Sequence, residues 1–128
     1  MTVYVETDFL LALIKDSDWL QEPAENALDE HDVVTSSYAY LELLLIRERH
    51  EFEYIKLFSN MLDIVPVETD AERQIVLKGV QYFEQGMTAF DSFHAATAET
   101  RGHPILGSDK AYDDVDPERI PLEPDADE

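Results

Sequence analysis

The chain has 128 residues, of which 45% are hydrophobic and 30% are charged, a balance typical of one folded domain. It contains no cysteine, which excludes disulfide scaffolds, thiolate metal sites and cysteine nucleophiles. No apolar run approaches the ~20 residues that span a bilayer, and the N-terminus lacks the basic segment of a signal peptide. We therefore expect a cytoplasmic protein that does not associate with a membrane.

The net charge of -20 arises from 29 acidic residues against nine lysines and arginines. Such an excess repels nucleic acid, whose binding normally depends on lysine and arginine contacts to phosphate. Two explanations remain open. The protein binds cations or basic partners, or it functions in a salt-rich cytosol, where the Debye length falls to ~3 Å at 1 M and the repulsion is screened. The acids are spread along the whole chain, which favours the adaptation to salt.

Short β-branched segments alternate with segments of helical periodicity along the chain. Strands are expected at residues 3–5, 33–34, 64–67, 104–107 and 120–122, and helices at 9–14, 19–30, 38–49, 52–61, 70–85 and 90–100. Thr69 and Glu72 have the spacing of a capping box, and Gly86 and Gly102 end the helices before them. This alternation predicts an α/β domain of three α/β/α layers, with a mostly parallel sheet of four to five strands. We expect this domain to span residues 1–122, and residues 123–128 to form an acidic, disordered tail.

Carboxylates fall where such a sheet binds its ligands, outside the carboxyl ends of the strands. Glu6 follows the first strand, Asp109 follows the fourth, and Glu42 and Asp91 lie in the helices after the second strand and before the fourth. Four acids held close together raise one another's pKa, which a divalent cation relieves. Oxygen ligands favour Mg²⁺ or Mn²⁺. The alternatives are that Asp91 is a helix N-cap and that Asp109 is a turn residue, whereas an acid among leucines, as at Glu42, is costly without a polar pocket.

Three acidic segments together resemble the PIN-domain family, specifically its small VapC-type toxin ribonucleases. They are VYVETDFLLAL at residues 3–13, the segment from TSS to ELL at 35–44, and DSFHAATA continued by GHPILGSDKAY over 91–112. The resemblance covers the chain to about Leu122, and with the acidic composition it indicates a halophilic archaeon as the source. The family's first acid is usually aspartate, followed two residues later by asparagine, whereas this chain has Glu6 and Asp8. Residues two apart on a strand point the same way, so either carboxylate is a candidate first ligand.

The resemblance implies an Mg²⁺- or Mn²⁺-dependent endoribonuclease, the toxin of a type II toxin–antitoxin pair. Glu6, Glu42, Asp91 and Asp109 would be catalytic and bind the metal, with Asp8 as a further ligand. Thr7 and Ser108 would orient a carboxylate or water, and Asp113 would act through water. The expected partners are an RNA substrate, a cognate antitoxin protein and a second copy of the chain, bound through the helices around Glu42. The alternatives are a catalytically weak PIN-like protein-binding module and a housekeeping RNA-processing nuclease of the same fold.

Overall fold

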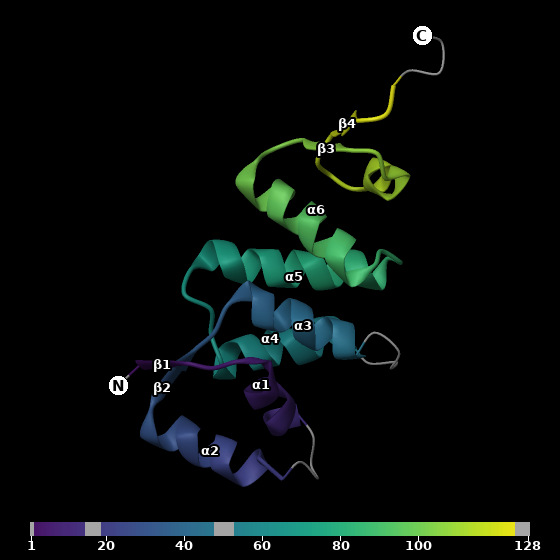
Figure 1. The fold of residues 1–128 in the computed structure, drawn as a ribbon. Coiled ribbons are helices and arrows are strands. Elements are labelled where there is room, and N and C mark those ends of the chain that lie inside the picture. Colours follow the sequence, from purple (N-terminus) through teal and green to yellow (C-terminus); the bar gives the residue numbers. More distant parts are fainter. Residues whose placement is uncertain (1, 15–18, 48–52, 125–128) are drawn as a thin grey trace.

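The computed structural model describes residues 2–14, 19–47 and 53–124. These segments contain helices and short strands, as the sequence predicts, but four helices follow one another between the second and the third strand (Figure 1). The elements are β1 (Thr2–Tyr4), α1 (Thr7–Ile14), α2 (Gln21–Glu30), β2 (Asp32–Val34), α3 (Ser37–Arg47), α4 (Tyr54–Ile64), α5 (Asp70–Glu84), α6 (Ala89–Arg101), β3 (Ile105–Gly107), the 3₁₀ helix η1 (Lys110–Asp114) and β4 (Arg119–Pro121). The expected helix end near residue 49, the expected helix start at residue 52 and residues 125–128 of the expected tail lie outside the described residues.

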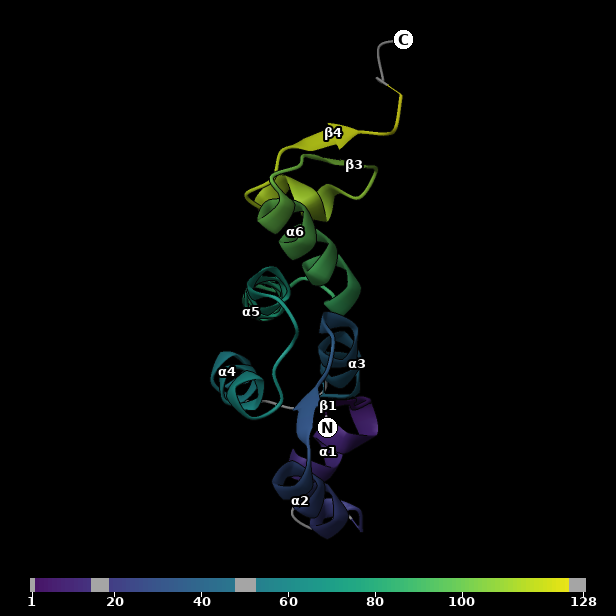
Figure 2. The same ribbon diagram turned by 90° about the vertical axis from the view of Figure 1, so that its left-hand side faces the viewer.

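The strands form two separate parallel pairs in the described segments, and not the single sheet of four to five strands that the sequence predicts. β1 pairs with β2 so that Val3 lies opposite Val33, and β3 pairs with β4 so that Leu106 lies opposite Ile120. The second pair lies beyond α5 and α6 as seen from the first pair, in both orientations of the ribbon (Figures 1 and 2). The expected combination of helices with short parallel strands is therefore present, but the strands are not joined into one sheet and do not alternate regularly with the helices.

The strand expected at residues 64–67 is mostly absent, because α4 continues to Ile64. What remains is one parallel bridge between Thr35 and Val67, with a hydrogen bond of 2.9 Å from the Thr35 amide to the Pro66 carbonyl. Proline has no amide hydrogen to donate to a ladder, which limits this segment to a single bridge beside β2.

The core of the N-terminal part is built from leucines and aromatics of α1, α3 and α4. Leu10, Leu43 and Leu44 are fully buried, and the buried Tyr40 donates a hydrogen bond of 2.7 Å to the Val65 carbonyl. At the end of the strand pair, the Thr35 hydroxyl donates to the Val5 carbonyl at 2.7 Å. These contacts fix the point where β1 and β2 end and where α1 and α3 begin.

Helices α5 and α6 are packed unusually close together. A Cβ atom added at Gly79 of α5 would lie 2.6 Å from the ring of Phe93 of α6, so only glycine fits at this crossing. The Thr69 hydroxyl caps α5 by accepting a hydrogen bond of 3.1 Å from the Glu72 amide, as predicted. The Glu72 carboxylate does not return to the cap but accepts from the Ser37 amide at 3.2 Å. Glu72 therefore ties the start of α5 to the start of α3.

No helix within the described segments is long and apolar enough to cross a membrane.

Candidate functional site

Three of the predicted acids lie together where β1 ends, and we call Glu6, Asp8 and Glu42 the N-terminal acid group. The buried Thr7 hydroxyl donates a hydrogen bond of 2.8 Å to the Glu42 carboxylate, which joins the first turn of α1 to α3. The structure thus gives Glu42, among its leucines, the polar partner that the sequence analysis required of such an acid. The sequence predicts that Glu6 and Asp8 lie on one strand and point the same way. Neither residue lies on a strand, because β1 ends at Tyr4 and α1 begins at Thr7.

The pKa of Glu6 is raised within this group. The largest cause is its hydrogen bond with the Asp8 carboxyl, followed by the negative charge of Asp8, the loss of hydration and the negative charge of Glu42. A raised pKa means that the folded state disfavours the ionised form of Glu6. The group is therefore electrostatically unfavourable near neutral pH, when no cation is bound.

We expect Glu6→Gln to raise the melting temperature at pH 7 in low salt and in the presence of a chelator, because it removes one of three repelling charges. A carboxyl with a raised pKa in the folded state contributes its stability below the unfolded-state pKa and loses it as the pH rises through the folded-state pKa. The gain from the glutamine should therefore disappear when the pH is lowered below about 4.

The matched control is Glu25→Gln, which removes the same charge from an exposed position on α2. Equal shifts in melting temperature for the two variants would show that Glu6 experiences only the overall charge of the protein, and a lower melting temperature for Glu6→Gln would contradict the repulsion directly.

Two further predicted acids, Asp91 and Asp109, lie near Tyr112, and we call these two acids the C-terminal acid group. The Tyr112 hydroxyl donates a hydrogen bond of 3.1 Å to the Asp91 carboxylate. Burial raises the pKa of Tyr112, and the hydrogen bond to Asp91 and the charges of Asp91 and Asp109 raise it further. Tyr112 therefore stays protonated and remains a donor to Asp91.

Asp91 is not the N-cap of α6, which was the structural alternative for this residue. Thr88 is the cap, and its hydroxyl accepts a hydrogen bond of 3.2 Å from the Asp91 amide. The Asp91 carboxylate is thus not used to cap the start of the helix. Asp109 does have a local role, because its carboxylate accepts from the Ala111 amide at 2.9 Å and caps η1.

The two acid groups do not combine into one cluster of metal ligands within the described residues. Among the described residues, no three histidine, aspartate or glutamate side chains lie close enough to hold a single metal ion. The physical reason is the divided sheet, since Glu6 follows β1 and Asp109 follows β3, and these strands are not neighbours. The predicted convergence of four acids depends on a pairing of β1 with β3, which the described strands do not make.

The remaining predicted residues are placed at the C-terminal strand pair. Ser108 is exposed directly after β3. Asp113 forms an ion pair with Arg119, whose Nε lies 2.6 Å from the Asp113 carboxylate. Arg119 also bonds Glu123 at 3.0 Å, so the first residue of the expected tail is held against β4. The Asp113 carboxylate thus takes part in an ion pair that connects η1 to β4.

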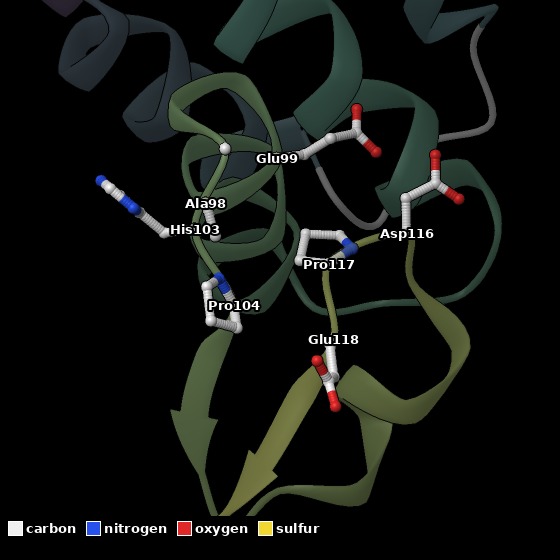
Figure 3. Close-up of a pocket in the computed structure, with 8 residues that line it drawn as sticks. Ala98, Glu99, His103, Pro104, Asp116, Pro117 and Glu118 are labelled. Atoms are coloured by element: carbon white, nitrogen blue, oxygen red, sulfur yellow. The ribbon is translucent and has the colours of Figure 1, made fainter.

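A pocket of about 300 Å³ lies between the end of α6 and the segment that leads into β4 (Figure 3). Two of its three acids, Glu99 and Asp116, hydrogen-bond each other, and this bond raises the pKa of Asp116. The Tyr82 hydroxyl of α5 donates to Glu99 at 2.6 Å and accepts from the Asp116 amide at 3.2 Å, while Lys78 of α5 forms an ion pair with Glu99. These acids anchor the C-terminal segment to α5 and α6.

Sequence reasoning gave no role to Tyr112 or Tyr82, although both hydroxyls contact acids. For Tyr112 a signal was present, because it stands three residues after Asp109 in a segment already singled out. For Tyr82 there was none, since its partners Glu99 and Asp116 lie 17 and 34 residues away.

Comparison with known proteins gives one finding, a match of the PIN domain family model to residues 3–117. No curated protein and no solved structure matches. The PIN domain is a nuclease-type α/β fold, and its members are generally metal-dependent nucleases. The matched segment includes both acid groups and covers most of the sequence. The chain belongs to the PIN domain family.

Proposed function

We propose that this protein is an Mg²⁺- or Mn²⁺-dependent endoribonuclease of the VapC type, the toxin of a toxin–antitoxin pair in the salt-rich cytoplasm of a halophile. Glu6, Glu42, Asp91 and Asp109 would be its catalytic acids, with Asp8 as a further metal ligand. Its partners would be an RNA substrate, an antitoxin protein and a second copy of the chain. Thr7 orients Glu42, and Ser108 and Asp113 are proposed to orient water nearby.

The observation that carries this proposal is the position of the carboxylates in a PIN domain chain. They follow the ends of β1 and β3, and they lie in the second turn of α3 and the first turn of α6. Oxygen donors of this kind are the ligands that Mg²⁺ and Mn²⁺ prefer. The Thr7 hydroxyl holds the Glu42 carboxylate, and the Tyr112 hydroxyl holds the Asp91 carboxylate, so one acid of each group has a fixed orientation.

The donor chemistry fits a divalent cation, but the placement of the donors within one chain does not. In the described residues the acids stand in two groups, and neither offers three side chains to one ion. A complete site therefore requires that the two groups be joined.

The test is cleavage of RNA by the purified protein in molar KCl, with Mn²⁺ and with a chelator. We expect cleavage with Mn²⁺ and none with the chelator, and high salt is needed to screen the charge of -20 from the RNA. Cleavage that persists in the chelator would contradict metal dependence. A toxin should also arrest the growth of cells that express it without its antitoxin, whereas a housekeeping nuclease should not.

A second function, that of a catalytically weak protein-binding module, is favoured by the separation of the two acid groups. It predicts that RNA stays intact under every metal condition while the protein still binds a partner. The cleavage test therefore separates these two functions.

A further inference from the structure

We infer that an unpaired strand of RNA lies in a groove along helix α6, with its bases stacked on Tyr38 and Phe90 and its phosphates beside Arg101. The inference rests on the proposed function for the identity of the substrate. It concerns a surface beside the two acid groups, however, and the binding that it predicts requires no cleavage.

Two pockets meet on one face of α6. The first, of about 220 Å³, lies between α6 and the start of α3 and includes Tyr38 and Phe90. The second, of about 390 Å³, lies between the end of α6 and β3 and includes Arg101. His94 and Thr97 line both pockets, so the two form one continuous depression, which we call the α6 groove. This position agrees with Figure 2, where α6 lies between α3 and the pair of β3 and β4.

The groove follows a stripe of side chains along α6. Phe90, His94, Thr97 and Arg101 are spaced by four, three and four residues, which places them on one line of an α-helix. None of the four is buried in the core, and Phe90, His94 and Arg101 are exposed. From the first to the last of them the helix rises ~16 Å, which is the length of a few stacked nucleotides at ~3.4 Å each.

The α6 groove has no acids, although the chain is rich in them. Among the described residues that line its two pockets, none is aspartate or glutamate, whereas 29 of the 128 residues of the chain are acidic. The pocket in Figure 3 is lined by three acids, and a further pocket between α1 and α2 includes Asp8. On a protein of net charge -20, the α6 groove is therefore a surface that a polyanion can enter without contacting carboxylates.

The groove also contains a cation that no described acid neutralises. Three other basic side chains of the described segments form ion pairs with acids, whereas Arg101 is exposed and forms no ion pair there. Guanidinium groups recognise phosphate through two parallel hydrogen bonds. His94 and His103, two of the four histidines of the chain, also line the groove and offer ring N–H donors. The lining thus provides the groups that bind a phosphate backbone.

Tyr38 and Phe90 provide surfaces on which bases can stack. Tyr38 is 63% exposed and Phe90 is 54% exposed, and both line the same pocket. Proteins that bind single strands combine such rings with a cationic groove, and the stacking tolerates any base. In a duplex the bases already stack on one another, so only an unpaired strand can use these rings.

The charge of the groove favours RNA over a second copy of the chain. In a symmetric dimer the same surface patch meets itself, so the groove would face a groove that also has no acids. Such a contact would bury Arg101 without a carboxylate, which is costly. An RNA strand covers the same aromatic rings and brings the anions that Arg101 lacks.

The α6 groove also leads to one of the proposed catalytic acids. Tyr112 lines the second pocket, and its hydroxyl donates the hydrogen bond of 3.1 Å to Asp91. Asp91 stands three residues before His94, so the two share a face of α6. On the other wall, Tyr38 stands four residues before Glu42 on α3. A strand in the groove is therefore held beside Asp91.

The inference is tested by the binding of a labelled single-stranded RNA of mixed sequence, measured by fluorescence anisotropy in chelator. Tyr38→Leu and Phe90→Leu keep an apolar side chain and remove the ring. We expect each to weaken binding by about 10-fold, as the loss of one stacked base does, without changing the dependence on KCl. The control Trp19→Leu removes an aromatic ring that is 84% exposed outside the groove, and it should bind like the parent.

Arg101→Gln tests the contact with phosphate. We expect the slope of log affinity against log KCl concentration to become shallower by ~0.7, the value for one phosphate of a single strand. Lys56→Gln removes the same charge from an exposed position on α4 and should leave the slope unchanged. Equal effects of these two variants would overturn the inference, and so would absence of RNA binding by the parent or an equal affinity for a duplex of the same sequence.

Light scattering on the same variants tests the protein alternative. We expect the mass of each groove variant to equal that of the parent at the same salt concentration. Loss of RNA binding together with dissociation of a dimer would assign the groove to a second copy of the chain and would overturn the inference.

Cleavage with Mn²⁺ then separates this inference from the proposed function. The groove variants should raise KM and leave kcat near that of the parent, since they lose contacts made equally in the ground state and the transition state. If RNA binds in the groove but the parent does not cleave it, the proposed function is wrong and the inference stands. If the parent cleaves and the groove variants bind and cleave as it does, the inference is wrong and the proposed function stands.

Discussion

Asp91→Asn is expected to lower RNA cleavage by about 100-fold or more, since loss of even an outer partner of a metal ligand typically costs 10- to 100-fold. The substitution removes a carboxylate that the proposed site requires and keeps its shape. The asparagine carbonyl can still accept the hydrogen bond from the Tyr112 hydroxyl, and Thr88 continues to cap α6. We therefore expect the melting temperature in chelator to stay near that of the parent, while stabilisation by Mn²⁺ disappears.

The matched control is Asp29→Asn, which removes the same charge from an exposed position of α2 and should cleave like the parent. Cleavage by both variants at the parent's rate, with the same dependence on Mn²⁺, would show that Asp91 is not catalytic. The protein-binding alternative would then be the better account of this chain.

The helices could be predicted from the sequence because their signals are local. Thr69 with Glu72 marks the start of α5, and Gly102 ends α6 in the left-handed conformation, with a φ of 71°. Thr88, the cap of α6, stands three residues before Asp91, in the same spacing as Thr69 and Glu72. Reading this spacing would have shown from the sequence that the Asp91 carboxylate is not needed as a cap.

The arrangement of the strands could not be predicted in the same way, because strand pairing is not local. Each strand has three residues, and no signal in ILG or TVY states which neighbour it pairs with. The alternation of strands and helices favours one sheet, but the close packing of α5 on α6 depends on Gly79 meeting Phe93, 14 residues further along the chain. The candidate acids were therefore identified by sequence, while their grouping required the structure.

The stability of the protein is expected to rise steeply with salt. Most of its acids have no lysine or arginine available to pair with, because nine lysines and arginines face 29 aspartates and glutamates. In the described residues the ion pairs involve Asp63, Glu99, Asp113 and Glu123. The other carboxylates repel one another in the compact state more than in the expanded unfolded chain.

Raising KCl from 50 mM to 2 M shortens the Debye length from more than 10 Å to less than 3 Å, which screens exposed charges even from near neighbours. We expect the melting temperature to rise by roughly 10 °C, the shift that about 2–3 kcal/mol produces in a domain of this size. Near pH 3.5 many carboxylates are protonated, so the same salt series should give a much smaller rise. Sucrose is the control for effects other than screening, because it favours burial at any charge. A melting temperature that stays level or falls with KCl at pH 7 would exclude the adaptation to salt and leave cation or basic-partner binding as the explanation of the acidic surface.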